Sequence, residues 1–352
     1  MKAEFQGWSA LVVAFVFCVV AMMGGAAVMG QDVVLKNDVV PEDNEVSGDT
    51  ASVWFLMTSH REPEQTDGLH LAVSRDGLRW TVINDDLSVL KPEVGEVFRD
   101  PSIASGPDGT YHLVWTIAWG AGIFKGVGYT TSKDLVHWEP QRIISVMQNE
   151  PETQFVWAPE LFRDTERDEW MIHWSSSVKG KFPETLHLFN GDSNPRIYYT
   201  RTKDFIEFSP SELLFDPACL AIDSYLYHAP DGRYCVFAKV DRETEPKRGI
   251  LMATAPSPTG PYTVDPQMIT DDDEGWAEGP SALVVPTGDG KSLKTRLYYA
   301  MSNYSSVYES EDLATWKSLR GKVMPPGGYR HGTVIRIPAE HAERLMAAHG
   351  QQ

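Results

Sequence analysis

Short apolar runs alternate with polar, turn-forming stretches along most of the chain after residue 50. Such alternation is typical of antiparallel strands joined by tight turns. The stretch 98–145 contains four of these runs, with Pro107-Asp108-Gly109 as the turn between the first two. The strands are expected at 100–105, 111–117, 126–131 and 138–145. Similar units are predicted to begin at Asp223 and Glu278.

A repeated motif gives the number of units. The form Ser/Thr-x-Asp-x-x-x-aromatic occurs four times, centred on Asp76, Asp134, Asp204 and Asp312. Neighbouring copies are 58, 70 and 108 residues apart, and the last spacing is two periods, with the missing copy at 250–255. Five repeats of this length, each with several short strands, predict an all-β fold, the five-bladed β-propeller. We interpret the repeated aspartates as turn caps and the aromatic residues as packing between units.

The two ends of the repeat region are predicted to share one unit. The first unit begins at 53–57 with a segment that resembles a second strand, and 332–337 is a lone strand at the other end. We expect this C-terminal strand to supply the missing first strand and close the ring, which removes exposed strand edges. The propeller then occupies 51–337, and the tail 338–352 contains a short helix at 339–348.

The first 30 residues have the composition of a targeting segment. Lys2 is followed by an almost wholly apolar run from Trp8 to Met23 and then by small residues. This order is typical of a signal peptide, here 1–30, and the alternative is a retained N-terminal anchor. Residues 31–50 are polar and are interpreted as a linker. We expect a secreted or periplasmic mature protein, because no second apolar run is long enough to span a bilayer.

Charge and cysteine content narrow the choice of partners. The formal net charge is −18, which repels nucleic acid and anionic membrane surfaces and favours a neutral ligand. The 11 tryptophans and 13 tyrosines can fill the core or offer flat stacking surfaces to sugars. The strand pattern places Cys219 and Cys235 too far apart for a disulfide, although export would permit one. We expect a monomer that binds carbohydrate, with no stable membrane association.

Five polar residues stand at or near the start of first strands, the strands nearest the channel of a propeller. They are Asp100, Glu160, Asp223, Glu278 and His331. We therefore expect all five at the mouth of the channel, one per blade. Three carboxylates suit glycoside hydrolysis, in which one protonates the leaving oxygen, one activates water, and a third raises the pKa of the acid. The alternative is ordinary turn chemistry or hydrogen bonding in the core.

The motifs around these residues resemble those of glycoside hydrolase family 43. They are Arg99-Asp100-Pro101-Ser102-Ile103, Trp157-Ala158-Pro159-Glu160, Ile222-Asp223, Glu278-Gly279-Pro280 and His331-Gly332-Thr333-Val334. The resemblance implies a five-bladed propeller that hydrolyses arabinose-, xylose- or galactose-type glycans with inversion. It also implies that Asp100 is the general base, Glu278 the general acid and Asp223 the residue that tunes the acid. His331 matches a family histidine that helps to hold a metal-bound water cluster, commonly calcium, in the central channel. No cofactor is expected to be required.

The remaining candidates are substrate-binding residues. Trp119 lies at the end of a second strand and is expected to form a subsite wall, and Arg330 could hydrogen-bond sugar hydroxyls. Trp157 and Glu160 belong to the matching motifs and are expected beside them. Glu160 departs from the family, which usually has aspartate there, and Ser224 replaces a usual proline. These departures indicate a divergent branch.

Two other functions fit parts of this pattern. Glycoside hydrolase families 32 and 68 also carry an Arg-Asp-Pro stretch, but they retain configuration and act on fructosides. This sequence has no upstream Asn-Asp-Pro-Asn stretch to supply their nucleophile, and Glu278 is followed by Gly-Pro instead of Cys. The second alternative is a non-catalytic, glycan-binding propeller, against which the three acidic residues argue.

Overall fold

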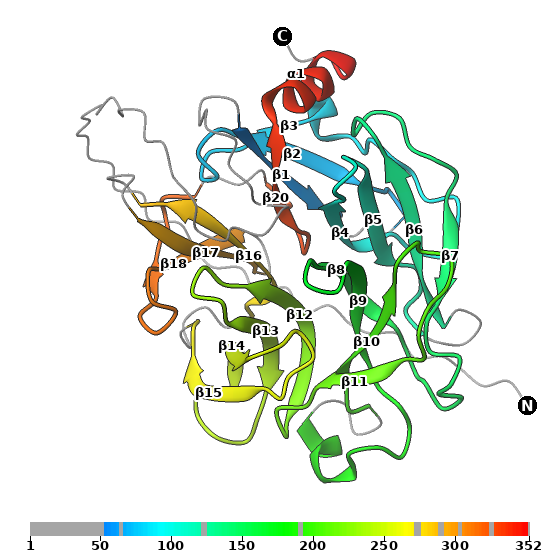
Figure 1. Cartoon of the computed structure of the whole chain (residues 1–352), viewed down its shortest axis with the longest axis vertical. Helices are drawn as coiled ribbons and strands as arrows, with labels where there is room; N and C mark the ends of the chain where they lie inside the picture. The colour runs from blue at the N-terminus through cyan, green and yellow to red at the C-terminus, as the bar shows by residue number, and fades with distance from the viewer. Residues whose placement is uncertain are drawn as a thin grey trace, which may run out of the picture. The chain divides into compact units, whose positions relative to one another are not determined.

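The structure is a computed structural model, and it describes residues 53–62, 66–120, 125–188, 193–270, 276–287, 292–301, 305–323 and 327–350. All of them belong to one compact unit of the chain, Val33–Gln352. The predicted signal peptide and linker, 1–30 and 31–50, lie outside the described residues. The described chain forms five four-stranded sheets, numbered here as blades 1 to 5 (Figure 1). This is the all-β, five-bladed propeller that the repeats predict.

The blades follow one another along the chain, and each strand pairs antiparallel with its neighbours. Blade 1 consists of β20 (Val334–Pro338), β1 (Val53–Ser59), β2 (His70–Ser74) and β3 (Thr81–Val82). Blade 2 consists of β4 (Arg99–Ser105), β5 (Tyr111–Thr116), β6 (Gly126–Ser132) and β7 (Arg142–Ser145). Blade 3 consists of β8 (Trp157–Asp164), β9 (Glu169–Ser176), β10 (Arg196–Thr202) and β11 (Glu212–Phe215).

The last two blades have the same order. Blade 4 consists of β12 (Leu220–His228), β13 (Tyr234–Asp241), β14 (Arg248–Ala255) and β15 (Thr263–Met268). Blade 5 consists of β16 (Glu278–Pro286), β17 (Leu293–Ala300), β18 (Ser305–Ser310) and β19 (Lys317–Ser318). The helix α1 (Ala339–Ala348) follows β20, and short 3-10 segments lie at Asn84–Asp86 and Pro183–Leu188.

First strands meet at the centre of this arrangement. β4 contacts β8, β8 contacts β12, and β12 contacts β16. β20 contacts both β16 and β4, and it pairs antiparallel with β1, with Met57 opposite Val334. The start of each first strand therefore lies close to the starts of its neighbours, and residues at these starts can share one site.

The repeated aspartates cap turns, as predicted. Asp134 Oδ1 accepts the backbone N–H groups of Val136 and His137 at 3.0 and 2.8 Å. The same pair of hydrogen bonds forms at Asp76, Asp204 and Asp312. This capped turn occupies the residues after Asp134, so the fourth strand begins at Arg142 and not at the predicted residue 138. The repeated aromatic residues do join blades, since Trp80 packs edge-on against Tyr298 with ring centres 6.2 Å apart.

The core fills the spaces between neighbouring blades. Trp115 and Trp174 are fully buried in two of the interblade clusters, so neither tryptophan is available to a ligand. A Cβ at Gly128 would lie 2.1 Å from the Trp115 ring, so glycine is needed beside this side chain. The helix α1 buries Ala342 and Leu345 against the cluster that joins blades 1 and 2. Its position agrees with the predicted helix at 339–348.

A repeated backbone feature marks the start of four first strands. Asp100, Ala158, Asp223 and Gly279 have φ angles of 50, 48, 51 and 59°, in the left-handed region. Each lies within a β-bulge or other irregularity of the pairing between the first and second strands. A bulge turns the local backbone and re-aims the side chains beside it. The fold therefore repeats one turned-out position at the central end of four blades.

Two smaller predictions concern the cysteines and the membrane. Cys219 and Cys235 are buried free thiols, and Cys235 lies opposite Tyr227 in the β12–β13 pairing, which is the predicted register.

In the described part of the chain, no helix has both the length and the apolar character needed to cross a membrane.

Candidate active site

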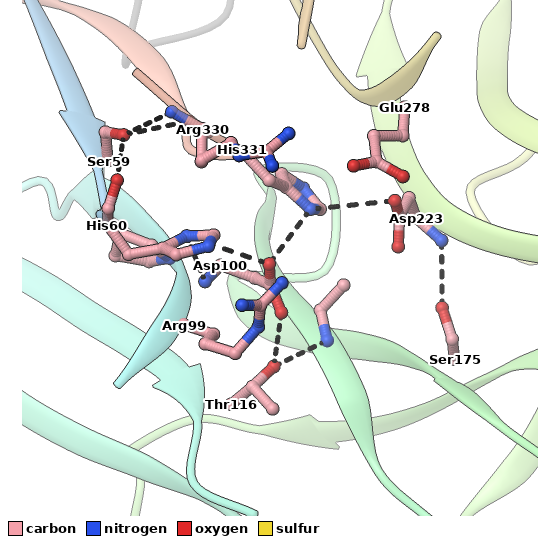
Figure 2. Close-up of polar contacts among 12 residues, drawn as sticks. Ser59, His60, Arg99, Asp100, Thr116, Ser175, Asp223, Glu278, Arg330 and His331 are labelled. Carbon is pink, nitrogen blue, oxygen red and sulfur yellow. Dashed lines mark hydrogen bonds and ion pairs between the residues drawn. The ribbon is translucent and has the colours of Figure 1, made fainter. Parts of the chain in front are cut away.

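Three acidic side chains meet around one histidine at the central ends of the first strands. Asp100 comes from β4, Asp223 from β12 and Glu278 from the first residue of β16. His331 lies between them, just before β20 (Figure 2). Asp100 and Asp223 are each 9 % exposed, and the Glu278 side chain is 23 % exposed. The sequence therefore predicted this group of four residues correctly as spatial neighbours.

His331 is the positive centre of the group. Its Nδ1 lies 3.4 Å from Asp100 Oδ1 and 3.8 Å from Asp223 Oδ2, and its Nε2 lies 3.6 Å from Glu160 Oε1. Burial by itself would lower the pKa of His331, but the three carboxylates outweigh burial and raise the pKa well above 6.5. The surrounding carboxylates therefore favour the positively charged form of the buried imidazole.

Asp100 is held as a carboxylate. The Thr116 hydroxyl donates a hydrogen bond to Asp100 Oδ2 at 2.8 Å. Burial would raise the pKa of Asp100, but the contact and charge of His331, together with the charge of Arg99, hold this pKa well below its usual range. A carboxylate that stays ionised in a nearly buried site can accept a proton from water without first losing its own.

His60 supports Asp100, and no motif in the sequence indicated it. The backbone N–H of Asp100 donates to His60 Nδ1 at 3.2 Å, so the His60 proton resides on Nε2, which lies 3.8 Å from Glu62 Oε1. Burial is the main reason that the pKa of His60 is lowered from 6.5. His60 is therefore neutral where His331 is charged. The only sign of it in the sequence is its place three residues after the predicted strand at 53–57.

Asp223 has the opposite electrostatic behaviour to Asp100. Its backbone N–H donates to Ser175 Oγ at 2.9 Å. Burial raises the pKa of Asp223 to about 6, with the negative charge of Glu278 adding to burial and the positive charge of His331 opposing it. Two aspartates at equivalent positions in two blades thus have pKa values shifted in opposite directions. Such a separation is what acid–base chemistry with several carboxylates requires.

Glu278 is fixed through one of its two oxygens. Lys239 Nζ lies 2.8 Å from Glu278 Oε2, and the indole N–H of Trp276 donates to the same oxygen at 2.9 Å. Trp276 is 44 % exposed, and the Lys239 side chain is only 3 % exposed. No motif in the sequence indicated either residue, although Trp276 lies two positions before Glu278.

The predicted substrate-binding tryptophans form one unit beside the carboxylates. Trp119 is 45 % exposed, and the Arg99 guanidinium lies 4.4 Å from the centre of its ring. The indole N–H of Trp157 donates to the Trp119 carbonyl at 2.8 Å, and the two rings meet edge-on at 6.1 Å. Phe155 stacks on Trp157 at 3.8 Å. Trp119 therefore offers an aromatic surface to solvent, and Trp157 fixes the loop that carries it.

The side chain of Arg330 points toward the space between His331 and Glu278 (Figure 2). Its backbone N–H donates to Ser59 Oγ at 2.8 Å, and its guanidinium donates to the Met301 carbonyl at 3.4 Å. Arg330 also lines a cavity with Tyr329 and His331. This location fits the predicted contact with sugar hydroxyls.

Glu160 does not lie at the mouth of the channel with the other four residues. It is 1 % exposed, and its Oε2 accepts the hydroxyls of Ser102 at 2.5 Å and Thr333 at 3.2 Å. Burial raises its pKa, against the opposing effect of His331. The residue that shares the repeated backbone position with Asp100 is Ala158, so Glu160 lies two residues farther along the strand. The prediction that Glu160 faces the mouth is wrong, and its contacts are those of a support for His331.

The calcium expected beside His331 stays a prediction. Calcium takes oxygen ligands, and the carboxylate oxygens of Asp100, Glu160 and Asp223 lie 3.4, 3.6 and 3.8 Å from the His331 ring nitrogens. In the described ranges, no group of three or more His, Cys, Asp or Glu side chains has an arrangement suited to a metal ion.

Two solved structures have a similar fold. The chain is similar to an endo-arabinase from Bacteroides thetaiotaomicron VPI-5482, with a TM-score of 0.52, 16 % identity, and coverage of 78 % of this chain and 97 % of that one. It is also similar to an endo-1,4-beta-xylanase from Bacteroides thetaiotaomicron VPI-5482, with a TM-score of 0.51, 12 % identity, and coverage of 79 % and 93 %. At these identities the likeness concerns the fold alone. No curated protein sequence matches the chain.

The fold and the site define a class, which is that of five-bladed propellers with a central carboxylate group. A sequence model of glycosyl hydrolases related to family 43, described as a probable glycosyl hydrolase domain, matches residues 51–343. The chain therefore belongs to this family, and the resemblance found in its motifs is confirmed.

Proposed function

We propose that the chain is a glycoside hydrolase that cleaves glycans with inversion at the anomeric carbon. The observation that carries this proposal is the pair Asp100 and Asp223. They hold equivalent positions in blades 2 and 4, yet the pKa of Asp100 is lowered and that of Asp223 is raised to about 6. One group is thereby suited to accept a proton and the other to influence a proton nearby.

In the proposed reaction, Asp100 is the general base. It takes a proton from a water molecule, and the water oxygen forms a bond to the anomeric carbon. Glu278 is the general acid, and it protonates the leaving oxygen on the opposite face of the sugar as the glycosidic bond breaks. Inverting enzymes separate the two carboxyl groups by about 6.5–9.5 Å, so that the water fits between the base and the sugar.

Asp223 is proposed to adjust the acid. Asp223 and Glu278 influence one another through their charges, and Lys239 acts on both. When Asp223 is ionised, its negative charge favours the protonated form of a neighbouring carboxyl group. The positive charge of His331 offsets the cost of burying the neighbouring carboxylates, since each buried carboxylate needs a compensating partner.

The proposed substrates are arabinose- or xylose-type glycans, with galactose-type sugars as a further prediction from the sequence. The two similar structures with TM-scores above 0.5 are described as an endo-arabinase and an endo-1,4-beta-xylanase. Trp119 would stack on one sugar face, and Arg330 would donate to sugar hydroxyls. An aromatic ring suits this task because it offers a flat apolar surface at small entropic cost.

Product release from aryl glycosides and plant oligosaccharides tests the proposal. Wild type is compared with Asp100→Asn and Glu278→Gln, and early time points are read by NMR. The matched control is Asp108→Asn, which changes an exposed carboxylate in a turn. Inverted product, lost in both site variants and kept in the control, would support the proposal. Retained configuration would favour the fructosidase-like alternative, and binding without turnover would favour a glycan-binding propeller.

We also propose several finer properties from the sequence. The mature protein would be a secreted or periplasmic monomer after removal of 1–30. β20 would close the ring, a proposal supported by its pairing with β1. Turnover would require no cofactor, so it would persist in the presence of a chelator.

A further inference from the structure

Strand register gives equivalent positions on the second strands of four blades. Each such position lies opposite the residue that precedes the left-handed position of the first strand. The pairs are Arg99 with Thr116, Trp157 with Ser175, Ile222 with Lys239, and Glu278 with Ala300. The same backbone position is therefore occupied by threonine, serine, lysine and alanine.

In two blades this position carries a short hydroxyl that joins one blade to the next. The backbone N–H of Ala158 donates to Thr116 Oγ1 at 2.8 Å, and that of Asp223 donates to Ser175 Oγ at 2.9 Å. In blade 5 the equivalent residue is Ala300, which has no polar side chain. The fold therefore needs at most a small residue here.

Lys239 departs from this pattern. It reaches from blade 4 to Glu278 of blade 5, and its side chain is almost completely buried. Removing an ammonium group from water is unfavourable unless a partner compensates it. The fold accepts serine, threonine or alanine at this position, so packing does not require a lysine here. We therefore relate Lys239 to the Glu278 carboxyl group that it contacts.

The contact selects one oxygen of Glu278. Lys239 and the Trp276 indole both donate to Oε2. The lone pairs of Oε2 are already occupied by these two hydrogen bonds, so a proton bound to Oε2 would displace one of the donors. When Glu278 carries a proton, that proton then resides on Oε1.

We propose that Lys239 is a positioning residue for Glu278, and that with the Trp276 N–H it fixes Oε2 so that Oε1 delivers the proton. This inference rests on the proposed function. In the step, the Oε1–H bond breaks and a new O–H bond forms to the leaving oxygen. The electron pair of the broken glycosidic bond goes to that oxygen, and the proton of the attacking water goes to Asp100. The negative charge left on Glu278 forms beside the Lys239 ammonium, which stabilises it.

The test compares leaving groups, because proton donation matters less when the leaving group is already a stable anion. The substrates are dinitrophenyl and phenyl α-L-arabinofuranosides and β-D-xylopyranosides. In Lys239→Met, kcat for the phenyl glycoside is expected to fall by about 10²-fold, the lower end of acid-catalysis contributions, while the dinitrophenyl glycoside changes little. KM should change little with either substrate. Lys239→Arg should recover part of the loss.

Two further variants make the comparison specific. Lys294→Met removes a partly buried ammonium–carboxylate contact, 2.6 Å from Glu309, at the opposite end of β17 from Ala300. Its kinetics should match wild type for both leaving groups. Trp276→Phe removes the second donor to Oε2 from a half-exposed position, and it should show the leaving-group dependence in weaker form. This variant decides the question if Lys239→Met does not fold.

The outcomes separate this inference from the proposed function. An equal loss with both leaving groups in Lys239→Met and Trp276→Phe would overturn the positioning role. The proposed function would still stand if Glu278→Gln lost more activity on the phenyl glycoside than on the dinitrophenyl glycoside, because that pattern identifies Glu278 as the acid. A wild-type protein without activity on any of these glycosides or on the oligosaccharide panel would overturn both.

Discussion

His331 Nδ1 lies 3.4 Å from Asp100 Oδ1, and this contact connects the segment before the C-terminal strand to the first strand of blade 2. The contact joins a buried cation to a buried anion. It favours the ionised form of Asp100 and the protonated form of His331. The proposed base thus depends on a residue 231 positions away in the sequence.

Removing the histidine should destabilise the protein. His331→Gln leaves Asp100 and Glu160 without their buried cation, and we expect the free energy of unfolding to fall by about 3–5 kcal/mol near pH 6. The pKa of His331 is raised above 6.5, so its stabilising effect is fully present below that pH and is lost as the pH rises through the higher folded-state value. Urea unfolding at acidic and strongly alkaline pH measures this, and an equal deficit at both would contradict it.

Removing the proposed base should leave space for a substitute. In Asp100→Ala, we expect kcat to fall by about 10²- to 10⁴-fold, the usual contribution of general base catalysis. Azide needs no base, and it can enter where the carboxylate stood. It should restore turnover and give a glycosyl azide of inverted configuration, detectable by NMR. Restored turnover with no azide in the product would argue against this role for Asp100.

Asp223 should influence stability with a definite pH dependence. Its pKa is raised from 3.8 to about 6, so within that window the unfolded chain ionises while the folded chain keeps its proton. The free energy of unfolding of wild type therefore falls as the pH rises through the window. Asp223→Asn lacks this effect. The melting temperature of Asp223→Asn minus that of wild type should therefore be larger at about pH 6 than at pH 3.8. Calorimetry that shows the reverse trend would refute the raised pKa of Asp223.

Trp119 should act in binding more than in chemistry. Trp119→Ala removes the exposed ring beside Arg99, and we expect KM to rise about tenfold with kcat nearly unchanged, as for uniform binding. Ile206→Ala is the control, because Ile206 is the most exposed large apolar side chain among the described residues, at 76 %. A fall in kcat at constant KM would place Trp119 in the chemical step instead.

The sequence predicted the fold well because one turn motif recurs in four of the five blades. The capped turns at Asp76, Asp134, Asp204 and Asp312 set the period, and the period locates the first strands. Asp100, Asp223, Glu278 and His331 follow from that placement.

The supporting residues were harder to find, for a physical reason. Thr116 and Lys239 lie on second strands, and whether their side chains reach the next blade depends on how the sheets pack. Glu160 was misplaced because the motif Trp-Ala-Pro-Glu puts Ala158, and not the acid, at the left-handed position. A two-residue displacement along a first strand moves a side chain from the mouth into the interior.

The repeated left-handed position also determines the symmetry of the site. Asp100 and Asp223 use this position for carboxylates, but Ala158 is buried there, and a Cβ at Gly279 would lie 2.5 Å from the His331 ring. A scaffold of repeated blades therefore presents an asymmetric reactive face. A sugar bound on the axis would meet an ionised aspartate on one side and the Glu278 carboxyl group on another. The site would then distinguish one orientation of the sugar from its reverse because Ala158 and Gly279 have no carboxylate at the repeated position.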